Sequence, residues 1–99
     1  MAAPTPRLEA RIRRDFPAAT AEKVVGHLAS LDDRDLGGHD VERMQAAIVL
    51  GSAGQWDRFV LIFRMLKVDW RDVLVAGGLA HADWPARLES ELPGPRSQR

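Results

Sequence analysis

Apolar residues recur along this chain at the three- and four-residue intervals of amphipathic helices, and the short β-branched runs lie inside longer windows of that period. Leu8, Ile12 and Phe16 form the first apolar stripe. We expect this helix to begin with Thr5 as its cap and Pro6 at the first helical position, where a missing N–H costs nothing. The first segment is therefore predicted to be helical.

Five further segments show the same period. We expect helices over residues 17–31, 39–54 (opening at His39 or Asp40), 55–68, 69–76 and 83–92. The short connections between them suit neighbouring helices that run antiparallel. The sequence predicts an all-α fold, a compact bundle of five or six short helices with orthogonal or solenoid-like packing.

Three tryptophans stand fourteen residues apart, Trp56, Trp70 and Trp84, and an aspartate precedes each of the last two. We expect Asp69 and Asp83 to cap helices, because a carboxylate there accepts hydrogen bonds from unpaired backbone N–H groups. Each tryptophan opens a helix on its apolar side. We therefore expect the three indole rings to be buried anchors of the core.

Composition limits the class of protein. Ninety-nine residues suffice for one domain, which we expect over residues 5–92, with disordered ends at 1–4 and 93–99. The formal net charge is zero, which argues against a body that attracts nucleic acid or anionic lipid as a whole. The chain has no cysteine and no apolar run near the ~20 residues of a membrane span. With no signal-peptide pattern either, we expect a cytoplasmic protein with no membrane contact.

Three strings in the sequence resemble a group of small all-helical bacterial proteins of uncharacterised function. They are ERMQAA at 42–47, DWRDVLVAGGLA at 69–80 and DWP at 83–85. The resemblance covers roughly residues 7–92 and implies the helical fold without implying an active site. A weaker likeness to HEAT-type helical repeats rests on the arginine, alanines and Leu50-Gly51 of residues 43–51. Since a fourteen-residue interval is less than half of such a repeat, that likeness is one of packing style.

The residues that carry chemistry form no recognisable catalytic or metal-binding pattern. His27, His39 and His81 lack the spacing of a transition-metal site. A loop from Asp33 looks like the start of a calcium loop, but glycine and methionine occupy its fifth and twelfth positions, where oxygen ligands are required. Ser30 follows His27 by three residues but lies in no tight nucleophile turn, and no glycine-rich phosphate loop follows a strand. We expect no enzyme activity, no metal and no cofactor.

One candidate binding surface is a basic stripe on the first helix. Arg7, Arg11 and Arg14 lie within about 60° of one another at helical spacing, on the side away from the apolar stripe. Such a stripe can bind phosphates or an acidic partner. The alternative is a solvated face carrying two i, i+4 ion pairs, Glu9–Arg13 and Arg11–Asp15.

The other candidate surface is a second apolar stripe on the helix over 55–68, formed by Leu61, Met65 and Val68. A helix that is apolar nearly all round is either central in its domain or covered by another chain. The central position is favoured because other helices flank this one in sequence, but an uncovered stripe would mark a partner or dimer face.

We expect a non-catalytic helical protein–protein interaction or adaptor domain that binds another protein or a second copy of itself, and no small-molecule substrate. The alternative is a nucleic-acid-binding accessory protein that uses Arg7, Arg11 and Arg14.

Overall fold

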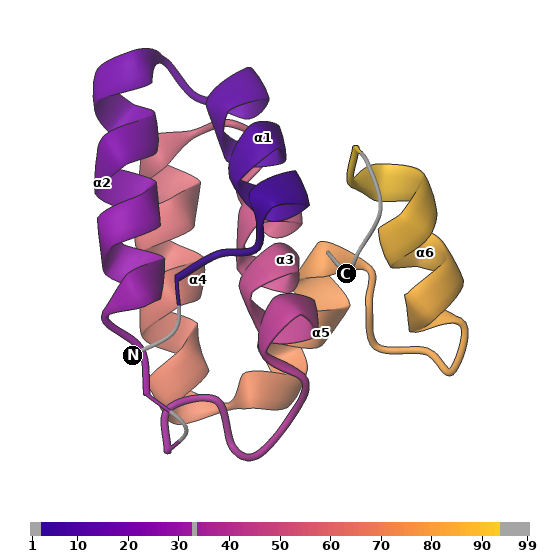
Figure 1. Cartoon of the computed structure of the whole chain (residues 1–99). Helices are drawn as coiled ribbons and strands as arrows, with labels where there is room; N and C mark the ends of the chain where they lie inside the picture. The colour runs from indigo at the N-terminus through magenta and orange to yellow at the C-terminus, as the bar shows by residue number, and fades with distance from the viewer. Residues whose placement is uncertain (1–2, 33, 94–99) are drawn as a thin grey trace.

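The computed structural model describes residues 3–32 and 34–93, and across these residues the chain forms six helices and no strand (Figure 1). The helices are α1 (Pro6–Asp15), α2 (Ala18–Ala29), α3 (Val41–Ser52), α4 (Trp56–Val68), α5 (Trp70–Gly77) and α6 (Trp84–Glu91). The predicted all-α bundle is confirmed. Half of the predicted disordered N-terminus, 1–2, and most of the predicted disordered C-terminus, 94–99, fall outside the described residues, as does Asp33, the first position of the calcium-like loop.

The starts of three helices follow from their capping residues. The side chains of Thr5, Asp40 and Asp69 each accept a hydrogen bond from a backbone N–H in the first turn of α1, α3 and α5. Asp83 occupies the cap position of α6 as predicted, but its side chain makes no such bond, so the predicted capping hydrogen bond is wrong. The backbone of Asp83 is turn-like, with φ −83° and ψ 11°, instead of the extended conformation usual for a cap.

The central element is α3, which packs against α1, α4, α5 and α6. Nine of its twelve residues are buried, a much larger share than in any other described helix. Small residues allow this: a β-carbon added at Gly51 would lie 2.9 Å from Ile62 Cδ1 and 3.2 Å from the carbonyl oxygen of Ala76. Helices α4 and α5 therefore approach α3 closely at Gly51.

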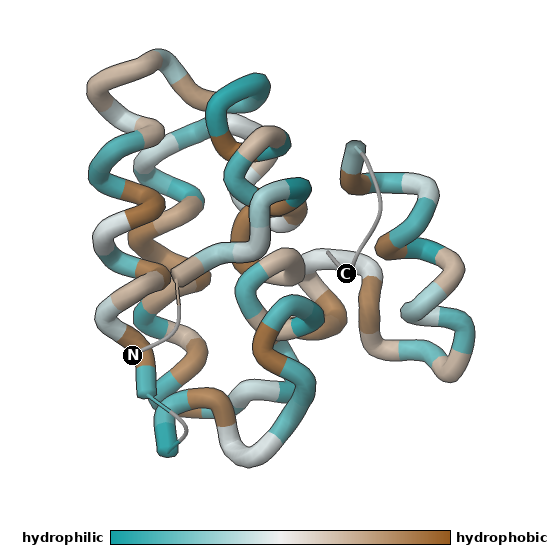
Figure 2. The backbone as a smooth tube through the Cα atoms, in the orientation of Figure 1, coloured by the Kyte–Doolittle hydropathy of each residue, from teal (hydrophilic) through white to brown (hydrophobic). Residues whose placement is uncertain are grey.

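The other helices surround α3 with one apolar side each. In Figure 1, α1 and α2 form a hairpin, α4 runs alongside α2, and α6 stands to one side. Brown apolar positions recur at short intervals along each helix (Figure 2), and the core residues among them include Leu8, Ile12, Val24, Leu28 and Phe59, all fully buried. This arrangement leaves the far sides of the peripheral helices open to solvent.

Polar contacts attach α6 to the rest of the molecule. The guanidinium of Arg43 on α3 donates two hydrogen bonds to the carbonyl oxygen of Leu79, at 3.0 and 2.8 Å. The same group lies 4.8 Å from the centre of the Trp84 ring. Leu88 and Leu92 supply the buried apolar contacts of the α6 region. The segment between α5 and α6 is thus fixed through one arginine.

The three tryptophans are half-buried, so the prediction that they are buried core anchors is wrong. Each opens a helix at the margin of the core, with a cation beside its ring. Lys23 Nζ lies 5.6 Å from the ring centre of Trp56, and Arg71 lies 5.5 Å from that of Trp70, which also packs on His39 at 3.9 Å. The fully buried aromatic anchor is Phe59.

The connection between α2 and α3 contains a half-buried carboxylate with a lowered pKa. Asp35 accepts a hydrogen bond from the backbone N–H of Asp32 and forms an ion pair with Lys67, 3.2 Å away. The backbone hydrogen bond is the main cause that lowers the pKa of Asp35, and Lys67 adds to it. Because the pKa is lower in the folded state, ionised Asp35 stabilises the fold above its unfolded pKa of about 3.9.

We expect that stabilisation to be lost as the pH falls through the folded-state pKa of Asp35. The variant Asp35→Asn keeps an oxygen that can accept from Asp32 but removes the charge. Urea unfolding at a series of pH values should show wild type more stable than the variant at pH 7, with the difference vanishing in acid. A difference independent of pH would contradict an electrostatic role for Asp35.

Candidate protein-interaction surface

The predicted basic stripe of α1 begins with an arginine that is buried. Arg7 is 3% exposed, and its guanidinium donates to both carboxylate oxygens of Glu42 on α3, at 2.9 and 2.7 Å. A further hydrogen bond of 2.9 Å reaches Glu89 on α6. Hydrogen bonding to Glu42 is the main cause that raises the pKa of Arg7, against the opposing effect of burial. The expectation that Arg7 lies on a solvated face is wrong, since it links three helices.

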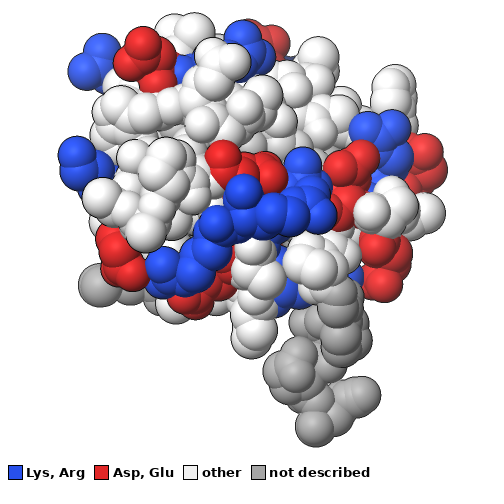
Figure 3. Space-filling model, turned by 90° about the horizontal axis from the view of Figure 1, so that it is seen from above, with Lys and Arg blue, Asp and Glu red and all other residues white. Residues whose placement is uncertain are grey.

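The other arginines of α1 also have carboxylate partners. Arg11 pairs with Asp15 at 2.8 Å and reaches Glu91 on α6, while Arg13 pairs with Glu9 at 2.8 Å. Both predicted i, i+4 pairs are thus confirmed. Arg14, which is largely exposed, has only a long 3.7 Å contact with Asp15. Figure 3 shows basic groups bordered by acidic ones on the face seen from above. A role of this stripe in binding a partner stays a prediction.

The second apolar stripe lies on the outside of α4 and is largely uncovered. Leu61 is 60% exposed and Val68 is 86% exposed, while Met65 is half-buried. The expectation that α4 is the central helix is therefore wrong, because the nearest helices occupy its other side and α3 takes the central place. The stripe is instead an uncovered apolar face, which was the alternative.

Two charged residues share this outer side of α4, and sequence reasoning missed them. Asp57 and Arg64 are exposed, and within the described part of the chain neither side chain has a hydrogen bond or an ion pair. By contrast, Lys67 on the same helix pairs with Asp35. The signal was present in the sequence, since Asp57 and Leu61, and likewise Arg64 and Val68, are four residues apart. We call the four residues Asp57, Leu61, Arg64 and Val68 the outer face of α4.

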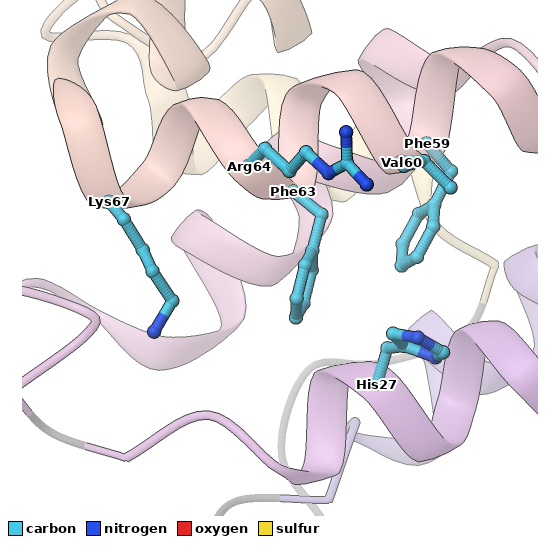
Figure 4. A pocket seen from close by; sticks show the side chains of 6 residues that line it. All are labelled: His27, Phe59, Val60, Phe63, Arg64 and Lys67. Atoms are coloured by element: carbon cyan, nitrogen blue, oxygen red, sulfur yellow. The ribbon is translucent and has the colours of Figure 1, made fainter.

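A pocket of about 350 Å³ adjoins the outer face, between α2 and α4 (Figure 4). Its lining residues are His27, Phe59, Val60, Phe63, Arg64 and Lys67. The imidazole of His27 meets the rings of Phe59 and Phe63 edge to face, with ring centres 5.9 and 5.5 Å apart. Arg64 lies along α4 near the mouth of the pocket. The pocket is therefore apolar within and basic at its margin.

The polar groups beside this pocket make local hydrogen bonds to the backbone. His27 Nδ1 lies 2.7 Å from the carbonyl oxygen of Lys23, one turn earlier. The hydroxyl of Ser30 donates to the backbone carbonyl of His27, at 2.6 Å, and is thus not directed to the imidazole as a nucleophile's would be. Among residues 3–32 and 34–93, no group of three or more histidines and carboxylates could bind a metal ion.

Comparisons with protein-family models, with curated proteins and with solved structures find no match for this chain. None of the helices in the described part of the chain combines the length and the apolar content that crossing a bilayer requires.

Proposed function

We propose that this protein is a non-catalytic interaction module that binds another protein chain through the outer face of α4. The observation that carries the proposal is the exposure of Leu61 and Val68, at 60% and 86%, one above the other on the same helix. Exposed aliphatic side chains that form one stripe, together with a half-buried methionine, are typical of a surface that another chain covers. Met65 belongs to the same stripe and can adapt to the partner's shape.

The charges around the stripe support a polypeptide partner. Asp57 and Arg64 offer one group of each sign, which can fix the orientation of a partner once the apolar residues are covered. The alternative, nucleic-acid binding through Arg7, Arg11 and Arg14, gains no support of this kind. Arg7 and Arg11 are already hydrogen-bonded to carboxylates, and releasing them would break contacts with α3 and α6.

We expect Leu61→Glu and Val68→Glu to abolish binding without unfolding the protein, because both side chains are exposed. Affinity capture from the native cell, together with sedimentation of the purified chain, would measure the loss. Val75→Glu is the matched control, since Val75 is an equally exposed apolar residue, 67%, on α5.

Val75→Glu should leave binding unchanged. A wild-type chain that stays monomeric and captures no protein would contradict the proposal, as would equal losses in all three variants.

A further inference from the structure

The outer face of α4 matches the same face of a second copy when the two helices run antiparallel. Asp57, Leu61, Arg64 and Val68 follow one another at intervals of four, three and four residues. At about 100° per residue they lie within about 60° of arc, so they form one narrow row along the helix. The row lies roughly opposite the side on which α4 buries its core residues. Intervals of four and three are also those by which paired helices meet along a seam.

The two charges stand at similar distances on either side of Leu61. With about 1.5 Å of rise per residue, Asp57 lies roughly 6 Å before Leu61 along the axis, and Arg64 lies roughly 4.5 Å after it. A two-fold axis close to Leu61 therefore brings Asp57 of one copy opposite Arg64 of the other, and the reverse. A parallel arrangement would instead align like charges, which is unfavourable.

We propose that α4 pairs antiparallel with α4 of a second copy of this chain, with Leu61 at the two-fold axis and an Asp57–Arg64 ion pair on each side of it. This inference rests on the proposed function, because it names the partner that the outer face binds. In the same register, Val68 of each copy lies toward the α3–α4 connection of the other copy, where Ala53 is exposed. Three residues of the row, Asp57, Leu61 and Arg64, thus have a counterpart that is either apolar or of opposite charge.

The side chain of Arg64 can reach this position. In Figure 4 it extends along α4 near the mouth of the pocket, and it is exposed there without a hydrogen bond to any described residue. Turning it toward a second copy therefore breaks no hydrogen bond or ion pair among the described residues. The same holds for Asp57.

The contact is small, so the dimer should be weak. A single pair of thirteen-residue helices falls at the low end of interface sizes, below about 1,200 Å² in total. We expect a dissociation constant of about 10–100 μM. Since the two ion pairs lie at the edge of the contact, association should weaken as salt is added.

Sedimentation equilibrium of the full chain, from about 5 μM to 1 mM, tests the pairing by charge reversal. Asp57→Arg and Arg64→Asp should each weaken dimerisation at least about tenfold at low salt, because each places two like-charged pairs across the axis. The double variant Asp57→Arg/Arg64→Asp restores opposite charges and should recover the wild-type dissociation constant to within about threefold. Circular dichroism and thermal melts would verify that these exposed substitutions leave the fold intact.

Three results would overturn the pairing: a wild-type monomer throughout the concentration range, single reversals without effect, or a double variant that does not recover. They are distinguishable from failure of the proposed function. If Leu61→Glu removes a dimer that the charge reversals leave unchanged, the outer face still pairs two copies and only the proposed antiparallel register fails. If Leu61→Glu instead removes binding of a different protein, the outer face still binds a chain and only the self-pairing fails.

Discussion

Replacing Gly77 with alanine should lower the free energy of unfolding by at least about 3 kcal/mol, at the upper end of what overpacking costs. Gly77 lies where α5 meets α3. A β-carbon there would overlap the Cα and the carbonyl oxygen of Ala47 and would lie 2.8 Å from its carbonyl carbon. The opposing atoms belong to the backbone of the central helix, so no side chain can move aside to relieve the overlap.

The matched control for Gly77→Ala is Gly26→Ala. Gly26 lies in α2, and an added β-carbon there would meet no atom within 4 Å. Alanine is the better helix former, so this variant should gain about 0.5–1 kcal/mol. Urea unfolding would measure both variants, and a melting temperature lower by about 12–24 °C is expected for Gly77→Ala. Equal stability of the two variants would contradict the close crossing of α3 and α5.

Replacing Glu42 with alanine should cost about 3–5 kcal/mol, because it leaves the charge of Arg7 buried without its main partner. Glu42 accepts both guanidinium hydrogen bonds described above and a third, of 2.5 Å, from the hydroxyl of Thr5. The ion pair with Glu89 would remain, but that carboxylate is largely exposed and compensates little.

The test of this buried pair is the double variant Arg7→Met/Glu42→Leu. It removes both charges and fills much of the same volume, so most of the lost stability should return. Arg13→Ala, on the same helix, removes exposed ion pairs with Glu9 and Glu22 and should destabilise the fold far less than Glu42→Ala does. Chemical denaturation of wild type and of the three variants would measure their free energies of unfolding. If Glu42→Ala and Arg13→Ala lower the free energy of unfolding equally, the guanidinium of Arg7 is not shielded from water.

Local signals in the sequence were sufficient for the helices but not for their relative positions. Thr5 and Asp69 cap helices as predicted because a cap depends on residues two or three positions away. The choice of central helix depended on charge as well as hydrophobicity. Residues 44–56, which include most of α3, carry no charged side chain, whereas α4 carries four. That difference in charge indicates that α3, and not α4, can be surrounded by other helices.

The candidate site was predictable in part. Helical spacing alone grouped Leu61, Met65 and Val68, and they do lie on one side of α4. Whether other helices cover that side depends on tertiary packing, which periodicity does not report. The burial of Arg7 was hidden for the same reason, since its partner Glu42 is 35 residues away in the chain. A charged residue beside an apolar stripe can equally face water or a distant partner.

The cluster of Thr5, Arg7, Glu42 and Glu89 joins residues from near both termini at one point on the central helix. A tag, fusion or truncation that displaces the start of α1 therefore also removes an anchor of α6, and the reverse holds as well. The start of α1 and the helix α6 are consequently coupled, although more than eighty residues separate Arg7 from Glu89 along the backbone.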